Sequence, residues 1–184
     1  MNRAVFLDRD GTIVEDVDYM FSPDQIRFIG GACEAIKLLN DANYKVIIIS
    51  NQSGVARGKL DEAALQAIDK SIKKLILSSG AYIDASYYCP HHPHEGSGSY
   101  RQECECRKPS PGMIKRSARE HNIDLKNSYM VGDKETDIKA GKNAGCKVIL
   151  ISNNGSTIAE ESDYIARDIL EAVNWIISRD KAHE

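Results

Sequence analysis

Four short apolar runs separated by helical patterns constrain the fold of this chain most strongly. The runs are AVFLD (residues 4–8), KVIIIS (45–50), SYMVGD (128–133) and KVILIS (147–152). Short apolar runs bounded by polar residues are typical of strands that are buried in a parallel sheet. We therefore predict a strand at each of these places.

Apolar side chains recur at helical spacing between these runs. The sets are Ala32, Ala35, Ile36 and Leu39; Ala64, Ile68, Ile72 and Leu75; and Ile138, Gly141 and Ala144. The stretch SPGMIKRSAREHN (residues 110–122) predicts a further helix, with Ser110 as N-cap and Pro111 in the first turn. Because strands and helices alternate, we predict an α/β fold with an open, mostly parallel sheet and helices on both faces. Chemistry gathers at the carboxyl ends of the strands in such sheets.

The length and charge of the chain limit what it can be. Its 184 residues suit a single domain, residues 1–184, in which we expect one long loop, residues 89–109. The net charge of −3 gives no general attraction to nucleic acid or to an anionic membrane. The N-terminal MNRAVFLDRDG is neither a signal peptide nor a membrane span. We therefore expect a cytoplasmic protein that binds neither nucleic acid nor membrane.

Polar side chains follow the predicted strands at their carboxyl ends. Asp8 and Asp10 can project the same way from an extended backbone, and Gly11 permits a sharp turn after them. The later strand ends offer Ser50, Asn51, Asp133 and Asp137, and Lys108 closes the long loop just before a helix. Carboxylates, a hydroxyl and an ammonium at one edge of a sheet suit phosphoryl transfer assisted by Mg²⁺.

Other interpretations of these segments are less consistent with the sequence. A calcium loop of the EF-hand type needs glycine at its sixth position, where this chain has Ile13. The segment GVARGKL (residues 54–60) has three residues between its glycines, where a nucleotide-binding phosphate loop has four, and Leu60 replaces the serine or threonine that binds Mg²⁺. That Asp8 and Asp10 merely cap a turn is disfavoured by the polar groups at the other strand ends.

Four short motifs resemble those of the haloacid dehalogenase superfamily of phosphatases. They are Asp8-Arg9-Asp10-Gly11-Thr12, Ser50-Asn51-Gln52, Lys108 and Gly132-Asp133, in the order of that superfamily and over most of the chain. The resemblance implies a Rossmann-like fold without a large cap domain and the Mg²⁺-dependent hydrolysis of phosphoric monoesters. The superfamily usually has threonine at the position of Ser50, and a hydroxyl serves in either case.

The same resemblance implies a role for each matching residue. Asp8 would be the nucleophile that forms an aspartyl phosphate. Asp10 would protonate the leaving oxygen and then activate the hydrolytic water, for which its neighbours must raise its pKa. Mg²⁺ would be bound by Asp8, the backbone carbonyl of Asp10 and Asp133. Ser50 and Lys108 would hold the phosphoryl oxygens.

Further positions resemble substrate contacts of this superfamily. They are Asp16, Tyr19, Asn51, Gln52, Ser53, Arg107, Lys108 and Lys134. Relatives commonly have glycine before the tyrosine, where this chain has Asp18. The segment around Tyr19 therefore departs from the usual pattern.

The long loop concentrates possible ligands of a zinc ion. Cys89, His91, Cys104 and Cys106 form a C-x-H and a C-x-C pair, and three thiolates with one imidazole complete a tetrahedral zinc shell. This Zn²⁺ would be structural, because it would order a glycine-rich loop and so position Arg107 and Lys108. The resemblance selects His91, while the sequence leaves His92 and His94 open as ligands. Free thiols or a disulfide are the alternative, which a reducing cytoplasm disfavours.

The loop also narrows the resemblance within the superfamily. It is similar to the zinc-bearing loops of histidinol-phosphate phosphatases and of D-glycero-D-manno-heptose 1,7-bisphosphate 7-phosphatases, and its twelve-residue spacer between His91 and Cys104 favours the second group. The resemblance implies a monomer that removes the 7-phosphate of this small sugar substrate in nucleotide-heptose synthesis. A histidinol-phosphate phosphatase, a DNA 3'-phosphatase and a non-catalytic zinc-containing binding module are the alternatives.

Overall fold

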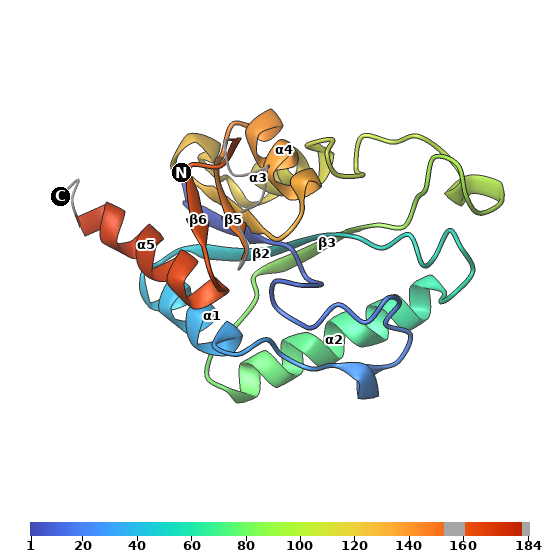
Figure 1. The fold of residues 1–184 in the computed structure, drawn as a ribbon, viewed down its shortest axis with the longest axis horizontal. Helices are drawn as coiled ribbons and strands as arrows, with labels where there is room; N and C mark the ends of the chain where they lie inside the picture. Colours follow the sequence, from blue (N-terminus) through green and yellow to red (C-terminus); the bar gives the residue numbers. More distant parts are fainter. Residues whose placement is uncertain (153–160, 182–184) are drawn as a thin grey trace.

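A single parallel sheet organises the molecule, as a computed structural model shows for residues 1–152 and 161–181 (Figure 1). Its strands are β1 (Ala4–Leu7), β2 (Lys45–Asn51), β3 (Ala85–Cys89), β4 (Tyr129–Gly132), β5 (Lys147–Ile151) and β6 (Tyr164–Ala166). They lie in the order β3-β2-β1-β4-β5-β6, and every neighbouring pair is parallel. The order reverses beside β1, so the carboxyl ends of β1, β2 and β4 enclose a crevice of the kind that binds ligands in open α/β sheets.

Helices cover both faces of the sheet, which confirms the predicted fold class (Figure 1). The helices are α1 (Ala32–Asp41), α2 (Glu62–Ser78), α3 (Gly112–His121), α4 (Glu135–Ala144) and α5 (Ile169–Lys181). Along β1, Val5 and Leu7 pack with α1, α2 and α5, while Ala4 and Phe6 pack with α3 and α4. Side chains alternate between the faces of a strand, so a run that is apolar throughout must be covered on both faces.

The helix predicted with Ser110 as its N-cap begins one residue later than expected. Pro111 occupies the N-cap position, and no side chain caps the helix there. The Ser110 N–H donates to the carbonyl of Arg107 at 2.8 Å, and the Gly112 N–H donates to that of Glu105 at 2.9 Å. The N–H groups of residues 110 and 112 thus bond to carbonyls of the preceding turn, and α3 starts at Gly112.

The prediction of a single long loop was wrong. A second long connection, residues 8–31, joins β1 to α1 and contains only a short 3₁₀ helix, Pro23–Gln25. It folds back on itself, because the N–H groups of Ile13 and Val14 both donate to the Arg9 carbonyl. Ile13 and Val14 are fully buried in the core, so irregular backbone here is held by apolar packing.

The sequence analysis did not predict the strands β3 and β6 or the helix α5. Of these, β3 positions the cysteine-rich loop. β3 lies at the edge of the sheet, and its register with β2 places Asn51 opposite Cys89. The loop therefore leaves the sheet beside the carboxyl end of β2. None of the helices in the described part of the chain is long and apolar enough to cross a lipid bilayer.

Candidate active site

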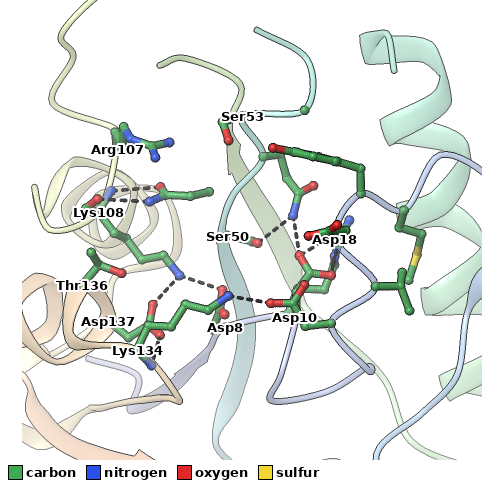
Figure 2. A pocket seen from close by; sticks show the side chains of 18 residues that line it. Asp8, Asp10, Asp18, Ser50, Ser53, Arg107, Lys108, Lys134, Thr136 and Asp137 are labelled. Atoms are coloured by element: carbon green, nitrogen blue, oxygen red, sulfur yellow. Dashed lines mark hydrogen bonds and ion pairs between the residues drawn. The ribbon is translucent and has the colours of Figure 1, made fainter. Parts of the chain in front are cut away.

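A polar pocket of about 370 Å³ opens at the carboxyl ends of β1 and β2 (Figure 2). Of the residues predicted to act on a substrate, its lining includes Asp8, Asp10, Asp16, Tyr19, Ser50, Asn51, Gln52, Ser53, Arg107, Lys108 and Lys134. The predicted metal ligand Asp133 is not a lining residue and lies beside Asp8 at the base. Residues from four separate stretches of the sequence thus meet in one place.

A buried ammonium group joins two carboxylates at the base of the pocket. Lys108 Nζ lies 2.7 Å from Asp8 Oδ1 and 2.5 Å from Asp137 Oδ1, and it also donates to the carbonyl of Ile49 at 2.8 Å (Figure 2). Burial lowers the pKa of Lys108, but the charges of Asp8 and Asp137 outweigh this effect and raise it above the ordinary value. Lys108 is therefore a fixed positive charge against the Asp8 carboxylate.

Asp10 is held differently from Asp8. Its carboxylate accepts two hydrogen bonds from the Arg9 guanidinium, both at 2.9 Å, and one from Gln52 Nε2 at 2.7 Å. The same Gln52 nitrogen donates to Ser50 Oγ at 2.9 Å. Burial raises the pKa of Asp10 and the Asp8 charge raises it further, while the charge and hydrogen bonds of Arg9 and the hydrogen bond from Gln52 only partly oppose the rise. The protonated form of Asp10 is thus favoured, whereas the neighbouring Asp8 carboxylate is paired with the ammonium of Lys108.

The carboxylates at the base can hold a divalent cation. Oxygen atoms of Asp8, Asp133 and Asp137 lie within 4.8 Å of one another. Asp133 Oδ1 is buried and finds no hydrogen-bond partner among the described residues. Burial, with the charge of Asp8, raises the pKa of Asp133 to about 6. A cation that binds carboxylate oxygens, as Mg²⁺ does, would coordinate Asp133 Oδ1 and offset the repulsion between Asp8 and Asp133.

Gly11 makes the approach of these carboxylates possible. Its φ is +87°, and a Cβ atom at this position would lie 2.4 Å from Asp133 Oδ2. Any other residue would therefore both strain the turn and displace Asp133. The turn after β1 brings Asp10 into the pocket, since β1 itself ends at Leu7.

Asn51 lines the pocket, yet both polar atoms of its side chain are engaged by Lys108. Its Nδ2 donates to the Lys108 carbonyl and its Oδ1 accepts from the Lys108 N–H, each at 3.0 Å. These two hydrogen bonds fix the backbone of Lys108 beside the end of β2. The substrate contact that the sequence predicts for Asn51 stays a prediction.

Cations and acids share the rim of the pocket. Lys134 Nζ pairs with Asp16 Oδ2 at 2.8 Å, and both side chains are about half exposed. The Arg107 guanidinium donates to the carbonyl of His91 at 3.0 Å, which ties the rim to the cysteine-rich loop. Asp18 has a φ of +58°, and its side chain lines the pocket (Figure 2). The rim can therefore attract an anion while offering carboxylates to hydroxyl groups.

Three cysteines and one histidine form a second cluster beside the pocket. Cys106 Sγ lies 3.1 Å from Cys104 Sγ, 3.2 Å from Cys89 Sγ and 3.3 Å from His91 Nδ1. These sulfur atoms are too far apart for disulfide bonds, whose length is about 2.05 Å. Hydrogen bonding from Cys89 lowers the pKa of Cys106 to about 5, so one thiolate forms readily. Three sulfurs and one imidazole nitrogen in contact fit the ligand set of a closed zinc site.

The neighbouring histidines point away from this cluster. His92 Nδ1 accepts from the N–H groups of His94 and Glu95 at 3.2 and 2.9 Å, and its Nε2 faces Arg57 at 3.2 Å. His94 is exposed. Of the three candidate histidines, His91 alone belongs to the cluster in the described part of the chain.

The sequence interpretation named Asp137 at a strand end without a partner, and it gave Arg9 no role. Asp137 lies in the first turn of α4 and is fully buried against Lys108, and only its place after Asp133 indicated a carboxylate here. Arg9 is 1% exposed and binds Asp10, although an arginine beside a strand end is ordinarily a surface residue. No pattern in the sequence indicates either pairing.

Comparisons with known proteins agree with this geometry. Residues 105–172 match the family described as HAD-hydrolase-like. The chain is 41% identical over 173 residues to the D-glycero-beta-D-manno-heptose-1,7-bisphosphate 7-phosphatase of Pasteurella multocida, covering 94% of each chain. It is 38% identical to the Escherichia coli K12 protein of the same name, covering 95% of this chain and 88% of the other.

The chain belongs to this family of HAD-like phosphatases.

A solved structure of the family has the same fold. The D,D-heptose 1,7-bisphosphate phosphatase from B. bronchiseptica, complexed with magnesium and phosphate, superposes with a TM-score of 0.84 at 33% identity, over 96% of this chain and 99% of the other. The family resemblance inferred from the four motifs is therefore confirmed, and with it the assignment to the phosphoric monoester hydrolases.

Proposed function

We propose that this protein removes the 7-phosphate of D-glycero-D-manno-heptose 1,7-bisphosphate, with the β anomer as substrate, through a phosphoenzyme formed on Asp8. The names of the relatives at about 40% identity support the substrate and the anomer. The observation that carries the proposal is the pairing of unlike carboxyl groups: Asp8 lies against a buried ammonium, and burial raises the pKa of Asp10. Pairs of carboxyl groups in different settings divide nucleophilic and acid-base work between them.

In the first step, a carboxylate oxygen of Asp8 attacks the phosphorus atom. The bond from phosphorus to the sugar oxygen breaks as the new bond to Asp8 forms. Asp10 gives its proton to the departing sugar oxygen, which would otherwise leave as a strongly basic alkoxide. Lys108 and the hydroxyl of Ser50 hold the phosphoryl oxygens as their charge redistributes.

In the second step, Asp10, now a carboxylate, takes a proton from a water molecule whose oxygen attacks the same phosphorus. The bond between phosphorus and Asp8 breaks, which returns Asp8 as a carboxylate and Asp10 as an acid. The products are the sugar monophosphate and inorganic phosphate. The Gln52 amide links Asp10 to Ser50 in both steps, because it contacts both side chains.

Two metal ions fit the residues of this chain. Asp8, Asp133 and the backbone carbonyl of Asp10 would hold Mg²⁺, which neutralises charge between a phosphate and an attacking carboxylate when bound. Cys89, His91, Cys104 and Cys106 would hold Zn²⁺ with all positions filled by protein. The zinc ligands end one residue before Arg107, so zinc binding would position the Arg107-Lys108 pair.

The distal phosphate of the substrate requires cations beyond the base of the pocket. Arg107 and Lys134 are the cationic side chains of the rim, and neither contacts Asp8 in the described structure. We assign them to the second phosphate and to the sugar, with Asp16, Tyr19, Gln52 and Ser53 as further substrate contacts. A substrate of this size requires neither nucleic acid nor a membrane, and we propose a cytoplasmic monomer formed of one domain.

Phosphate release from competing substrates tests this proposal. The purified protein with Mg²⁺ is assayed side by side on both anomers of the heptose bisphosphate, on histidinol phosphate and on a 3'-phosphorylated oligonucleotide. We expect the highest kcat/KM for the β anomer. A higher value for histidinol phosphate or for the oligonucleotide would identify one of the alternative enzymes, and inactivity on all four would indicate a binding module.

A chemical trap tests the mechanism separately. Beryllofluoride with Mg²⁺ mimics a phosphoryl group on a carboxylate, so mass or structural analysis should place it on Asp8. Its attachment to another residue would overturn the assignment of the nucleophile.

A further inference from the structure

Arg9 is a buried cation that the proposed steps do not use. Its side chain is 1% exposed, in a protein whose other charges are mostly solvated. Burial lowers the pKa of Arg9, but the Asp10 carboxylate outweighs this effect and raises it, so the guanidinium remains charged. Burying a charge is unfavourable unless hydrogen bonds and a counter-charge compensate it. Its contacts therefore indicate what the residue does.

On one side, Arg9 grips Asp10 with two nitrogen atoms. Nε donates to Asp10 Oδ1 and Nη2 to Asp10 Oδ2, each at 2.9 Å. A two-pronged contact of this kind fixes the plane of the carboxyl group as well as its position. Asp10 lies beyond the end of β1 in a turn, and its carboxylate accepts side-chain hydrogen bonds from Arg9 and Gln52 among the described residues, so Arg9 supplies the two-pronged part of its restraint.

On the other side, Arg9 is itself held by β3 and α2. Its guanidinium carbon lies 5.8 Å from the centre of the Tyr88 ring, within the range of a cation–π contact. The Tyr88 hydroxyl donates to Asp69 Oδ1 at 2.7 Å, and Asp69 pairs with Lys73 at 2.9 Å along α2. A continuous row of contacts thus leads from the rigid body of the protein to the Asp10 carboxyl group.

We propose that Arg9 is a positioning residue that holds Asp10 in the orientation needed to exchange a proton with the substrate oxygen and with water. The proposal rests on the two-step function above. Among the described residues Arg9 makes no hydrogen bond or ion pair with Asp8, and its side-chain contacts are with Asp10 and Tyr88. Removing Arg9 should therefore impair the proton transfers while leaving the attack of Asp8 on phosphorus largely intact.

The leaving group separates these two effects. In p-nitrophenyl phosphate the nitrophenolate departs as an anion, so phosphorylation of Asp8 needs no proton from Asp10. Hydrolysis of the phosphoenzyme still needs Asp10 to take a proton from water. A sugar phosphate needs Asp10 in both steps. Rapid mixing reports the first step as a burst of nitrophenolate and the second as the steady rate that follows.

We expect a distinctive result for Arg9→Met, which keeps the length of the side chain and removes its donors. The burst rate on p-nitrophenyl phosphate should stay within about threefold of the original protein, while the steady rate and the kcat on the heptose bisphosphate fall about 10²-fold, the scale of acid-base help. On p-nitrophenyl phosphate kcat/KM should change by less than about threefold, because this ratio reports binding and the phosphorylation of Asp8, which do not need Arg9. Arg9→Lys retains the charge but loses the two-pronged contact with Asp10, so its steady rate should lie between those of the original protein and Arg9→Met.

Two outcomes would overturn the proposal. A burst rate that falls as far as the steady rate would place the role of Arg9 at Asp8 or in the fold as a whole. Steady rates that change by less than about threefold would show that Asp10 needs no such restraint. Arg9→Lys keeps the test decisive if Arg9→Met does not fold, because it retains a cation at this position without the two-pronged contact and should lower the steady rate about tenfold while the burst rate stays within about threefold.

Failure of the proposed substrate is distinguishable from failure of this inference. A protein that hydrolyses p-nitrophenyl phosphate but not the heptose bisphosphate would refute the substrate assignment. The burst and the steady rate on the aryl phosphate would still decide the role of Arg9.

Discussion

The two clusters of ionisable groups in this protein differ in how their charge is balanced. At the base of the pocket, Asp8 and Asp137 carry their own counter-charge, because the ammonium of Lys108 lies within 2.7 Å of each. In the cysteine-rich loop, three sulfur atoms meet with no lysine or arginine among the cluster residues. Like groups placed so close together repel one another once ionised, unless a cation joins them.

The difference indicates two ways of using a metal. The sulfur atoms of the loop cluster have no ammonium or guanidinium partner among the cluster residues, so the ion that joins them would be permanent and structural. The pocket is already organised by Lys108, so its ion and its phosphate can come and go with each turnover. The short segment Cys106-Arg107-Lys108 joins the two clusters, and changes on either side of it test how far they depend on each other.

The largest effect is expected at the base of the pocket. Asp8→Asn should lower kcat by at least about 10⁴-fold, because an amide carries no charge with which to attack phosphorus. The fold should persist, since Lys108 keeps its contact with Asp137. Phosphate release and thermal unfolding measure the two properties, with Asp10→Asn as a comparison that should lose about 10²-fold. Substantial turnover by Asp8→Asn would disprove the nucleophile.

A smaller effect, on both zinc content and activity, is expected in the loop. Cys104→Ser should lower zinc content below one ion per chain and reduce kcat/KM about 10–100-fold, since a disordered loop no longer positions Lys108. Metal analysis and phosphate release are measured on the same preparation. Cys33→Ser, a change on α1 outside the cluster, should leave zinc content unaltered. Full activity in a zinc-free Cys104→Ser protein would mean that the clusters are independent.

The segment between the clusters should show selectivity. Arg107→Ala should lower kcat/KM for the heptose bisphosphate by a factor that corresponds to a loss of about 1.5–3 kcal/mol in transition-state stabilisation, the scale of a charged hydrogen bond. The value for a small monophosphate should change little. Lys108→Ala should disable both substrates. Zinc content is the control, because Arg107 also donates to the carbonyl of His91. An equal loss on both substrates with zinc retained would place Arg107 in the catalytic set.

The smallest effect is expected where the segment is clamped to the sheet. Asn51→Ala removes two hydrogen bonds to the Lys108 backbone and should lower kcat about 10-fold on every substrate, with KM nearly unchanged. Steady-state kinetics on the bisphosphate and on a small monophosphate measure this. A rise in KM for the bisphosphate alone would show that Asn51 contacts the substrate.

Much of the framework follows from local patterns in the sequence. The four apolar runs predicted β1, β2, β4 and β5, because strands covered on both faces must be apolar throughout. The edge strand β3 reads ASYYC, and four of its five residues are only partly buried, so the same signal is missing. β6 has three residues, too few to form a pattern.

The sequence predicted most of the residues of the site but not the contacts between them. Strand ends brought together the carboxylates, Ser50 and Lys108, because parallel strands end at one edge of a sheet. The contacts of Arg9 with Asp10 and of Asn51 with Lys108 depend on where a turn and a loop return to the sheet. Those positions are set by tertiary packing, which no local pattern in the sequence describes.

The cysteine-rich loop begins and ends at the same residue of the sheet. Asn51 lies opposite Cys89, where the loop starts, and binds the backbone of Lys108, where it finishes. The loop is therefore a cassette with a closed base, and the spacer between His91 and Cys104 can be exchanged without altering the span that the loop must bridge or removing a proposed zinc ligand. Doubling the length of such an insert costs only about 0.6 kcal/mol in closure entropy. For protein engineering, this cassette is the part of the scaffold where a new specificity can be built without redesigning the core.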